Sequence, residues 1–154
     1  MTMFRIFKQP ALAAGCFFLF CALSCSRSAD VGALLPPEFT VVSTCCCVRF
    51  HDLFATQGCI GMVCGTANET AVQAICFAYA RAEEPPVLLR AFINLCEETG
   101  LAYSLPGGNK KPVVLTQDST GCFFCVSYVK KRLFFASSSS DSKAIAAMGR
   151  CLSQ

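Results

Sequence analysis

Apolar residues follow a strand-like pattern in two regions of the chain, one on each side of a central stretch with helical spacing. Residues 39–50 and 59–64 are rich in β-branched and aromatic side chains, which favours strands. Gly61 in the second indicates either a bulge or a close approach of another backbone segment. A turn at 52–58 separates them. Three further strands are predicted over residues 113–117, 122–129 and 132–137, with a turn at 118–121 and a hairpin tip at Lys130-Lys131.

Apolar positions three and four residues apart predict helices elsewhere in the chain. The predicted helices cover residues 70–82, 87–99 and 142–152. Thr66 and Glu69 have the spacing of a capping box before the first helix, and Pro85-Pro86 break that helix. Gly100 stands where a helix-terminating glycine belongs, and the Ser137–Ser140 run with Asp141 supplies a cap for the last helix.

The order of these elements is ββ–αα–βββ–α. Strands that follow one another in runs, without β-α-β alternation, predict an α+β domain. We expect a small antiparallel sheet with helices packed on one face, formed by residues 39–154 as a single cysteine-rich domain. Residues 25–38 have the polar, proline-containing composition of a tether, ending near Pro36-Pro37.

The first 24 residues have the layout of an export signal. Arg5 and Lys8 lie in an N-terminal region without acids, and residues 11–23 form an unbroken apolar run before the small residues around Ser24. The run is 13 residues long, whereas a bilayer-spanning helix needs about 20. The pattern therefore favours a cleavable signal peptide over residues 1–24.

The stretch Ala22-Leu23-Ser24-Cys25 resembles the lipobox of bacterial lipoproteins. In that class a cysteine receives the lipid, with acyl chains such as palmitate, and becomes the new N-terminus. Ser24 fits the pattern, whereas Ala22 stands where Leu is usual and Leu23 where a smaller residue is usual. The resemblance covers residues 1–25 and implies lipidation of Cys25 and a membrane anchor.

Ordinary signal cleavage is the alternative, because Ala22-x-Ser24 also satisfies a small-x-small rule. The product would then be a secreted module without lipid. In a eukaryotic setting Asn68-Glu69-Thr70 would be a glycosylation sequon, but the overlapping capping box is the preferred interpretation.

Composition excludes two classes of protein. Hydrophobic residues make up 54% of the chain and charged residues 15%, with a mean hydropathy of +0.51, so the chain has ample apolar surface to bury and is not intrinsically disordered. Without Arg5 and Lys8 the formal charge falls from +3 to about +1. A near-neutral body argues against a nucleic-acid partner, which would need a basic face.

Ten of the 13 cysteines lie beyond Cys25, and an even number in an exported chain points to disulfides. Most of them, however, occupy positions that a small hydrophobic residue would fill. We expect a few bridges together with several buried thiols.

Cys122 and Cys125 form the strongest candidate for enzyme chemistry, as a C-x-x-C redox pair. The pair lies in a strand-like run, where its sulfur atoms would point to opposite faces and could not bridge each other. Cys45, Cys47 and the single histidine, His51, lack a metal-ligand spacing, so neither a metal site nor a cofactor is predicted.

These observations predict an exported lipoprotein, held at the cell membrane or outer membrane and facing the periplasm or the surface. Its unusually apolar body favours a binding module for an envelope protein or a small apolar ligand rather than an enzyme. The alternative functions are an envelope thiol–disulfide oxidoreductase that uses Cys122 and Cys125, and the secreted disulfide-stapled module.

Overall fold

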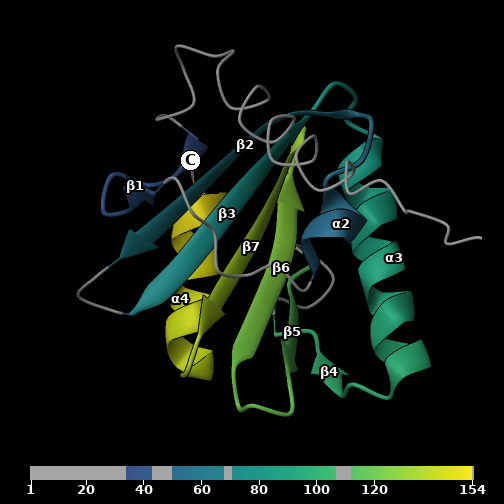
Figure 1. The fold of residues 1–154 in the computed structure, drawn as a ribbon, viewed down its shortest axis with the longest axis vertical. Coiled ribbons are helices and arrows are strands. Elements are labelled where there is room, and N and C mark those ends of the chain that lie inside the picture. The colour runs from purple at the N-terminus through teal and green to yellow at the C-terminus, as the bar shows by residue number, and fades with distance from the viewer. Residues whose placement is uncertain (1–33, 43–49, 68–70, 107–111, 154) are drawn as a thin grey trace, which may run out of the picture.

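The fold is built on one seven-stranded antiparallel sheet with strand order β1-β2-β3-β7-β6-β5-β4 (Figure 1). The computed structural model describes residues 34–42, 50–67, 71–106 and 112–153. The strands are β1 (Thr40–Val42), β2 (Cys59–Ala67), β3 (Val72–Tyr79), β4 (Tyr103–Ser104), β5 (Val114–Gln117), β6 (Phe123–Val129) and β7 (Arg132–Ser138). The α+β class and the antiparallel sheet predicted from the sequence are confirmed.

Helices cover both faces of this sheet, whereas the sequence predicted helices on one face. The helices are α2 (His51–Phe54), α3 (Glu84–Thr99) and α4 (Asp141–Leu152). The short helix α2 and the long helix α3 lie on one side, and α4 lies on the other, over β3, β6 and β7 (Figure 1). Two separate cores result, one under each layer of helix.

Residues 70–82 were predicted to be a helix, and this prediction is wrong, because Val72–Tyr79 form the central strand β3. Ile75, Phe77 and Tyr79 face the core under α3, and the alternate residues face the core under α4. A strand buried on both faces reads as a continuous apolar run, so residues three and four apart are apolar as they would be in a helix. Thr66, the proposed cap, lies within β2 and pairs with Gln73, while Glu69 lies outside the described residues.

The second predicted helix is confirmed but begins earlier than expected, at Glu84. Pro85 and Pro86 lie in its first turn, where the backbone N–H groups have no intrahelical acceptor and a proline costs little. The helix ends at Gly100, whose φ of 69° is the left-handed conformation expected there. The prolines therefore start α3 instead of ending a preceding helix.

The remaining boundaries follow the sequence closely, with two additions. The register of β2 against β3 shifts between Cys59 and Gly61, which confirms the predicted bulge. Residues 51–54 form one helical turn that overlaps the start of the turn predicted at 52–58, and the two-residue edge strand β4 was not predicted. Within the predicted strand 39–50, Thr40–Val42 are β1 and residues 43–49 lie outside the described part.

The segment before β1 packs against the sheet at its β1–β2 edge. Leu35 and Phe39 are buried in the core under α4, and Glu38 forms an ion pair with Arg150 near the end of α4. Gly65 in β2 makes this packing possible, because a Cβ at that position would lie 2.8 Å from Leu35 Cδ1 and 3.0 Å from Phe39 Cβ. Leu35, which the sequence places in the tether, is thus part of the folded body.

We expect Gly65→Val to lower the free energy of unfolding by about 1–3 kcal/mol, because its side chain overlaps the segment before β1. Gly61→Val in the same strand is the control, since a Cβ there meets nothing within 4 Å. Urea unfolding of both variants measures the difference. Equal losses in the two variants would show that the segment is not packed against Gly65.

Candidate functional site

Cys25 and the signal segment lie outside the described residues, so the proposed lipidation site has no structural description. None of the helices in residues 34–42, 50–67, 71–106 and 112–153 has the length and apolar content that a membrane span requires. The candidate anchor therefore rests on the sequence.

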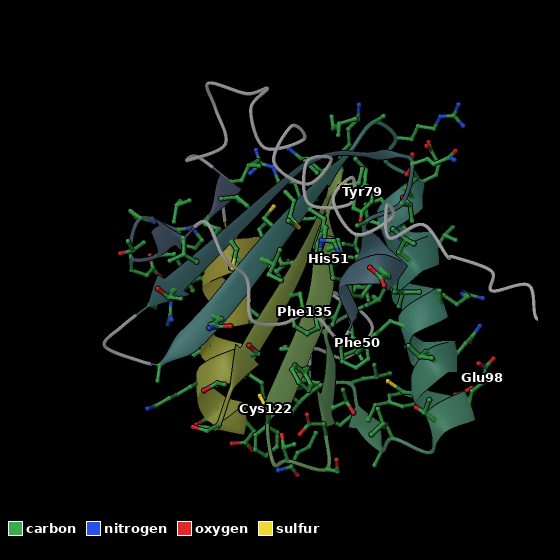
Figure 2. The ribbon with its side chains drawn as sticks, in the orientation of Figure 1. Phe50, His51, Tyr79, Glu98, Cys122 and Phe135 are labelled. Atoms are coloured by element: carbon green, nitrogen blue, oxygen red, sulfur yellow. The ribbon has the colours of Figure 1, made fainter. Side chains whose placement is uncertain are left out.

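The structure places Cys122 and Cys125 on opposite faces of the sheet. Cys125 is fully buried in the core under α4, whereas Cys122, just before β6, is half-buried beside the core under α3. Cys122 lies at the end of the sheet away from Tyr79 (Figure 2). Its Sγ donates a long hydrogen bond to the Ser138 carbonyl, at 3.6 Å. The two sulfur atoms are not positioned to form a bridge with each other.

Burial makes the core thiols unreactive in the folded state. Cys76, Cys125 and Cys151 are fully buried in the core under α4, and desolvation raises the pKa of each from 9.0 to about 12. Desolvation also raises the pKa of Cys96, on the buried face of α3, and of the half-buried Cys59. All five are free thiols. Because the thiolate is the reactive species, these residues act as small apolar groups.

Cys45 and Cys47 lie outside the described residues, and the remaining polar candidates are His51 and Tyr79. His51 Nδ1 lies 3.4 Å from Oδ1 of its exposed neighbour Asp52, in α2. Buried Tyr79 donates a 2.7 Å hydrogen bond from its hydroxyl to the Phe54 carbonyl, which ties α2 to β3, and burial raises its pKa. Within the described ranges, no group of three or more His, Cys, Asp or Glu residues is arranged to hold a metal ion.

A hollow of about 220 Å³ opens at the β4–β5 edge of the sheet, which we call the β4–β5 hollow. Leu115 and Phe123 line it and are half-buried at the margin of the core under α4. Ser104, paired with Leu115, and Gln117, paired with Phe123, complete this face of the lining. The apolar lining of the hollow thus belongs to the α4 face, whereas Tyr103, which pairs with Thr116, is hydrogen-bonded to Glu97 of α3 on the other face.

Three polar side chains that line the hollow form hydrogen bonds within the chain. Thr116 donates from Oγ1 to the Ala102 carbonyl at 2.8 Å, and Gln117 donates from Nε2 to the Gly121 carbonyl at 3.2 Å. The Tyr103 hydroxyl donates to Glu97 Oε1 at 2.9 Å, and this bond raises the pKa of Tyr103. These bonds leave a preformed surface with an apolar floor.

Sequence reasoning missed this hollow because it missed β4. A two-residue strand has too few positions for a period to be visible, and residues 104–112 have the composition of a loop. The available signal was Tyr103 and Leu105, two large apolar residues that are 36% and 52% exposed.

Comparison with known proteins gives no family assignment: no protein-family model and no curated protein matches the chain.

We expect Cys122 to react with a disulfide reagent at pH 8 at least ten times faster than Cys125, because Cys125 is desolvated and protonated. Comparing labelling rates of the native protein with those of Cys122→Ser and Cys125→Ser isolates each thiol from the other cysteines. Fast labelling that either substitution removes would indicate a coupled redox pair instead.

Stability should fall steadily as the pH rises above 9. A thiol with a pKa of about 12 in the fold and 9.0 when unfolded stabilises the fold fully below pH 9, and this contribution disappears as the pH approaches 12. At pH 10 each of the three thiols then lowers the free energy of unfolding by about 1.4 kcal/mol relative to neutral pH. Urea unfolding between pH 7 and 10.5 measures the decline, which Cys125→Ala should reduce by about that amount at pH 10. An undiminished decline would contradict the burial of this thiol.

Proposed function

We propose that this chain is a bacterial envelope lipoprotein, anchored through Cys25, whose folded body binds a protein partner at the β4–β5 hollow. The proposed location in the envelope is supported by the basic N-terminal residues, the short apolar run and the lipobox-like stretch that ends at Cys25. The protein has no enzymatic role in this proposal, and the anchor holds its folded body at a membrane surface.

The observation that carries the binding role is the uncovered apolar face at one edge of the sheet. Helices cover the central strands on both sides, yet Leu115 and Phe123 remain half-buried next to α4. Tyr103 and Leu105 add exposed apolar surface from β4 and the residue after it. Exposed apolar surface that is locally concentrated and bordered by polar groups is typical of an interaction site.

The size of the hollow favours a protein partner over a small ligand. Sites for small molecules are usually about 300–1,000 Å³ and enclose most of the ligand. The β4–β5 hollow holds about 220 Å³ and is open to solvent. That volume suits one or two side chains of a partner that also contacts the rim.

The position of the hollow is compatible with a membrane anchor. Eight residues lie between Cys25 and Leu34, a span of at most about 30 Å, and Leu35 packs at the β1–β2 edge. The hollow lies at the opposite edge of the seven-stranded sheet, roughly 30 Å away across six strand spacings (Figure 1). A body tethered at the first edge has the hollow directed away from its anchor, where an envelope protein has access to it.

The oxidoreductase alternative has weaker support, because Cys125 is buried and protonated and faces away from Cys122. A secreted module without lipid would use the same hollow, so it differs from our proposal only in lacking the lipid anchor and in its location.

Two measurements test this proposal. Intact mass of the membrane-extracted protein should match an N-terminal Cys25 with acyl chains, and Cys25→Ala should release the body from the membrane fraction. In living cells, a photo-crosslinker at Leu115 should give an adduct of discrete mass. The control is a photo-crosslinker at Val87 on α3, which should give no such adduct, because Val87 is 66% exposed but lies outside the hollow. Equal crosslinking at both positions would contradict a binding role for the hollow.

A further inference from the structure

We propose that one end of the sheet rests on the anionic surface of the membrane that holds the anchor. We call it the basic end, and it consists of Ile60, Arg81, Lys130, Lys131 and Arg132. This inference rests on the proposed lipid anchor and is independent of what the β4–β5 hollow binds.

Strand pairing brings the residues of the basic end together. Gly61, next to Ile60 in β2, pairs with Ala78 near the end of β3. Ala78 pairs in turn with Arg132, the first residue of β7, which follows the two lysines of the β6–β7 hairpin. Arg81 lies two residues beyond the end of β3. Two strand spacings, about 10 Å, thus separate Ile60 from the cations of the hairpin (Figure 1).

An exposed apolar side chain stands beside exposed cations at this end. Lys130 and Lys131 are exposed and Arg132 is half-buried. Ile60 is 68% exposed and is the residue at which the register of β2 against β3 shifts. This combination suits the interface of a bilayer, where attachment adds burial of apolar area to attraction by anionic lipids.

The hairpin contains a lysine where its backbone favours another residue. Lys130 has a φ of 52°, in the left-handed region that glycine and asparagine occupy most readily. Two-residue hairpin loops prefer those residues for this reason. Turn formation therefore does not account for a lysine at this position, whereas contact with an anionic surface would.

The acids closest to the basic end belong to the turn between β3 and α3. Glu84, the first residue of α3, has its carboxylate against the backbone of Gly58, where an added Cβ would collide with it. Glu83 precedes it and lies two residues from Arg81, whose charge it offsets. The three successive cations at 130–132 lie on the other side of this end, in the β6–β7 hairpin, and give it a positive charge.

Charged side chains elsewhere in the described residues give the molecule a polarity along its strands. Glu38 is paired with Arg150, Asp52 lies 3.4 Å from His51 Nδ1, and Arg90 lies midway along α3. At the end away from the β6–β7 hairpin, α3 ends and α4 begins (Figure 1). The charged residues of these two helix ends are Glu97, Glu98, Asp141 and Lys143. An anionic surface would therefore attract the basic end and repel the opposite one, which orients the body.

The length of the tether permits this orientation. Eight residues lie between Cys25 and Leu34, a span of at most about 30 Å. Leu35 packs against Gly65, and Ile60 is five residues away in the same strand, about 17 Å. The tether thus keeps the basic end within reach of the membrane, where its high effective concentration makes a few weak contacts sufficient. The β4–β5 hollow, beside the far end of β6, would then face away from the membrane.

The test uses the acylated mature chain in nanodiscs that contain a tracer lipid with a spin-labelled headgroup. Paramagnetic attenuation of backbone amide NMR signals then measures which residues lie near the headgroups. With about one-third phosphatidylglycerol in phosphatidylcholine, attenuation at residues 58–60 and 130–132 should exceed that at residues 102–104 and 115–117 about fivefold. This contrast should disappear in pure phosphatidylcholine and at about 0.5 M sodium chloride.

A pair of variants with the same change of charge identifies the cations responsible. Lys130→Gln/Lys131→Gln should reduce the contrast to the level found in pure phosphatidylcholine. Arg90→Gln/Lys143→Gln also removes two exposed cations, but from outside the basic end, and should leave the contrast unchanged.

A second pair tests the apolar contact. Ile60→Ser should reduce the contrast about twofold, whereas Val87→Ser, which removes another exposed apolar side chain, should not change it. Equal attenuation in anionic and neutral nanodiscs, or equal losses within either pair, would overturn the inference. Because the sample is selected by its acylated mass, that result would leave the proposed anchor in place, whereas an unacylated mature chain would overturn both.

Discussion

The structure depends on one constraint: the two strands at the centre of the sheet, β3 and β7, are apolar on both faces. Ile75 pairs with Phe135 toward α3, and Ala74 pairs with Ala136 toward α4. Neither face can be left to water, so the chain must supply a helical layer for each. The two faces differ in composition. Aromatic rings gather under α2 and α3, where the ring centroids of Phe50 and Phe135 lie 5.9 Å apart (Figure 2), whereas alanine and cysteine make up half of the buried residues under α4.

The difference between the two faces determines where the sheet remains open. Small residues on β3 and β7 let α4 approach the sheet closely with its own Ala144 and Ala147. One helix of 12 residues is about 18 Å long and about 10 Å wide, which is less than the width of seven strands. The segment before β1 covers one edge, and the β4–β5 edge keeps its apolar face exposed. The hollow is therefore a consequence of covering a wide sheet with a single short helix.

The sequence predicted the elements whose apolar residues follow a clear period. The prediction failed for β3, a strand that is buried on both faces. The strands around Gly61 and Lys130-Lys131 and the end of α3 at Gly100 were found because a bulge, a tight turn and a left-handed cap each need particular residues. The segment at 70–82 was misassigned because two-sided burial removes the alternation that identifies a strand. The hollow could not be predicted, since it depends on which strands α4 covers, and that is a property of the tertiary packing.

The same packing explains why several cysteines of this domain are buried thiols with low reactivity. A thiol is close to alanine in volume and slightly larger, so Cys76, Cys125 and Cys151 fill the narrow space under α4 without forcing the helix away. Thiol exchange needs a thiolate with access to solvent, and burial removes both. Packing of α4 on the sheet therefore shields these thiols, and the β4–β5 edge remains a part of the sheet that this helix does not cover.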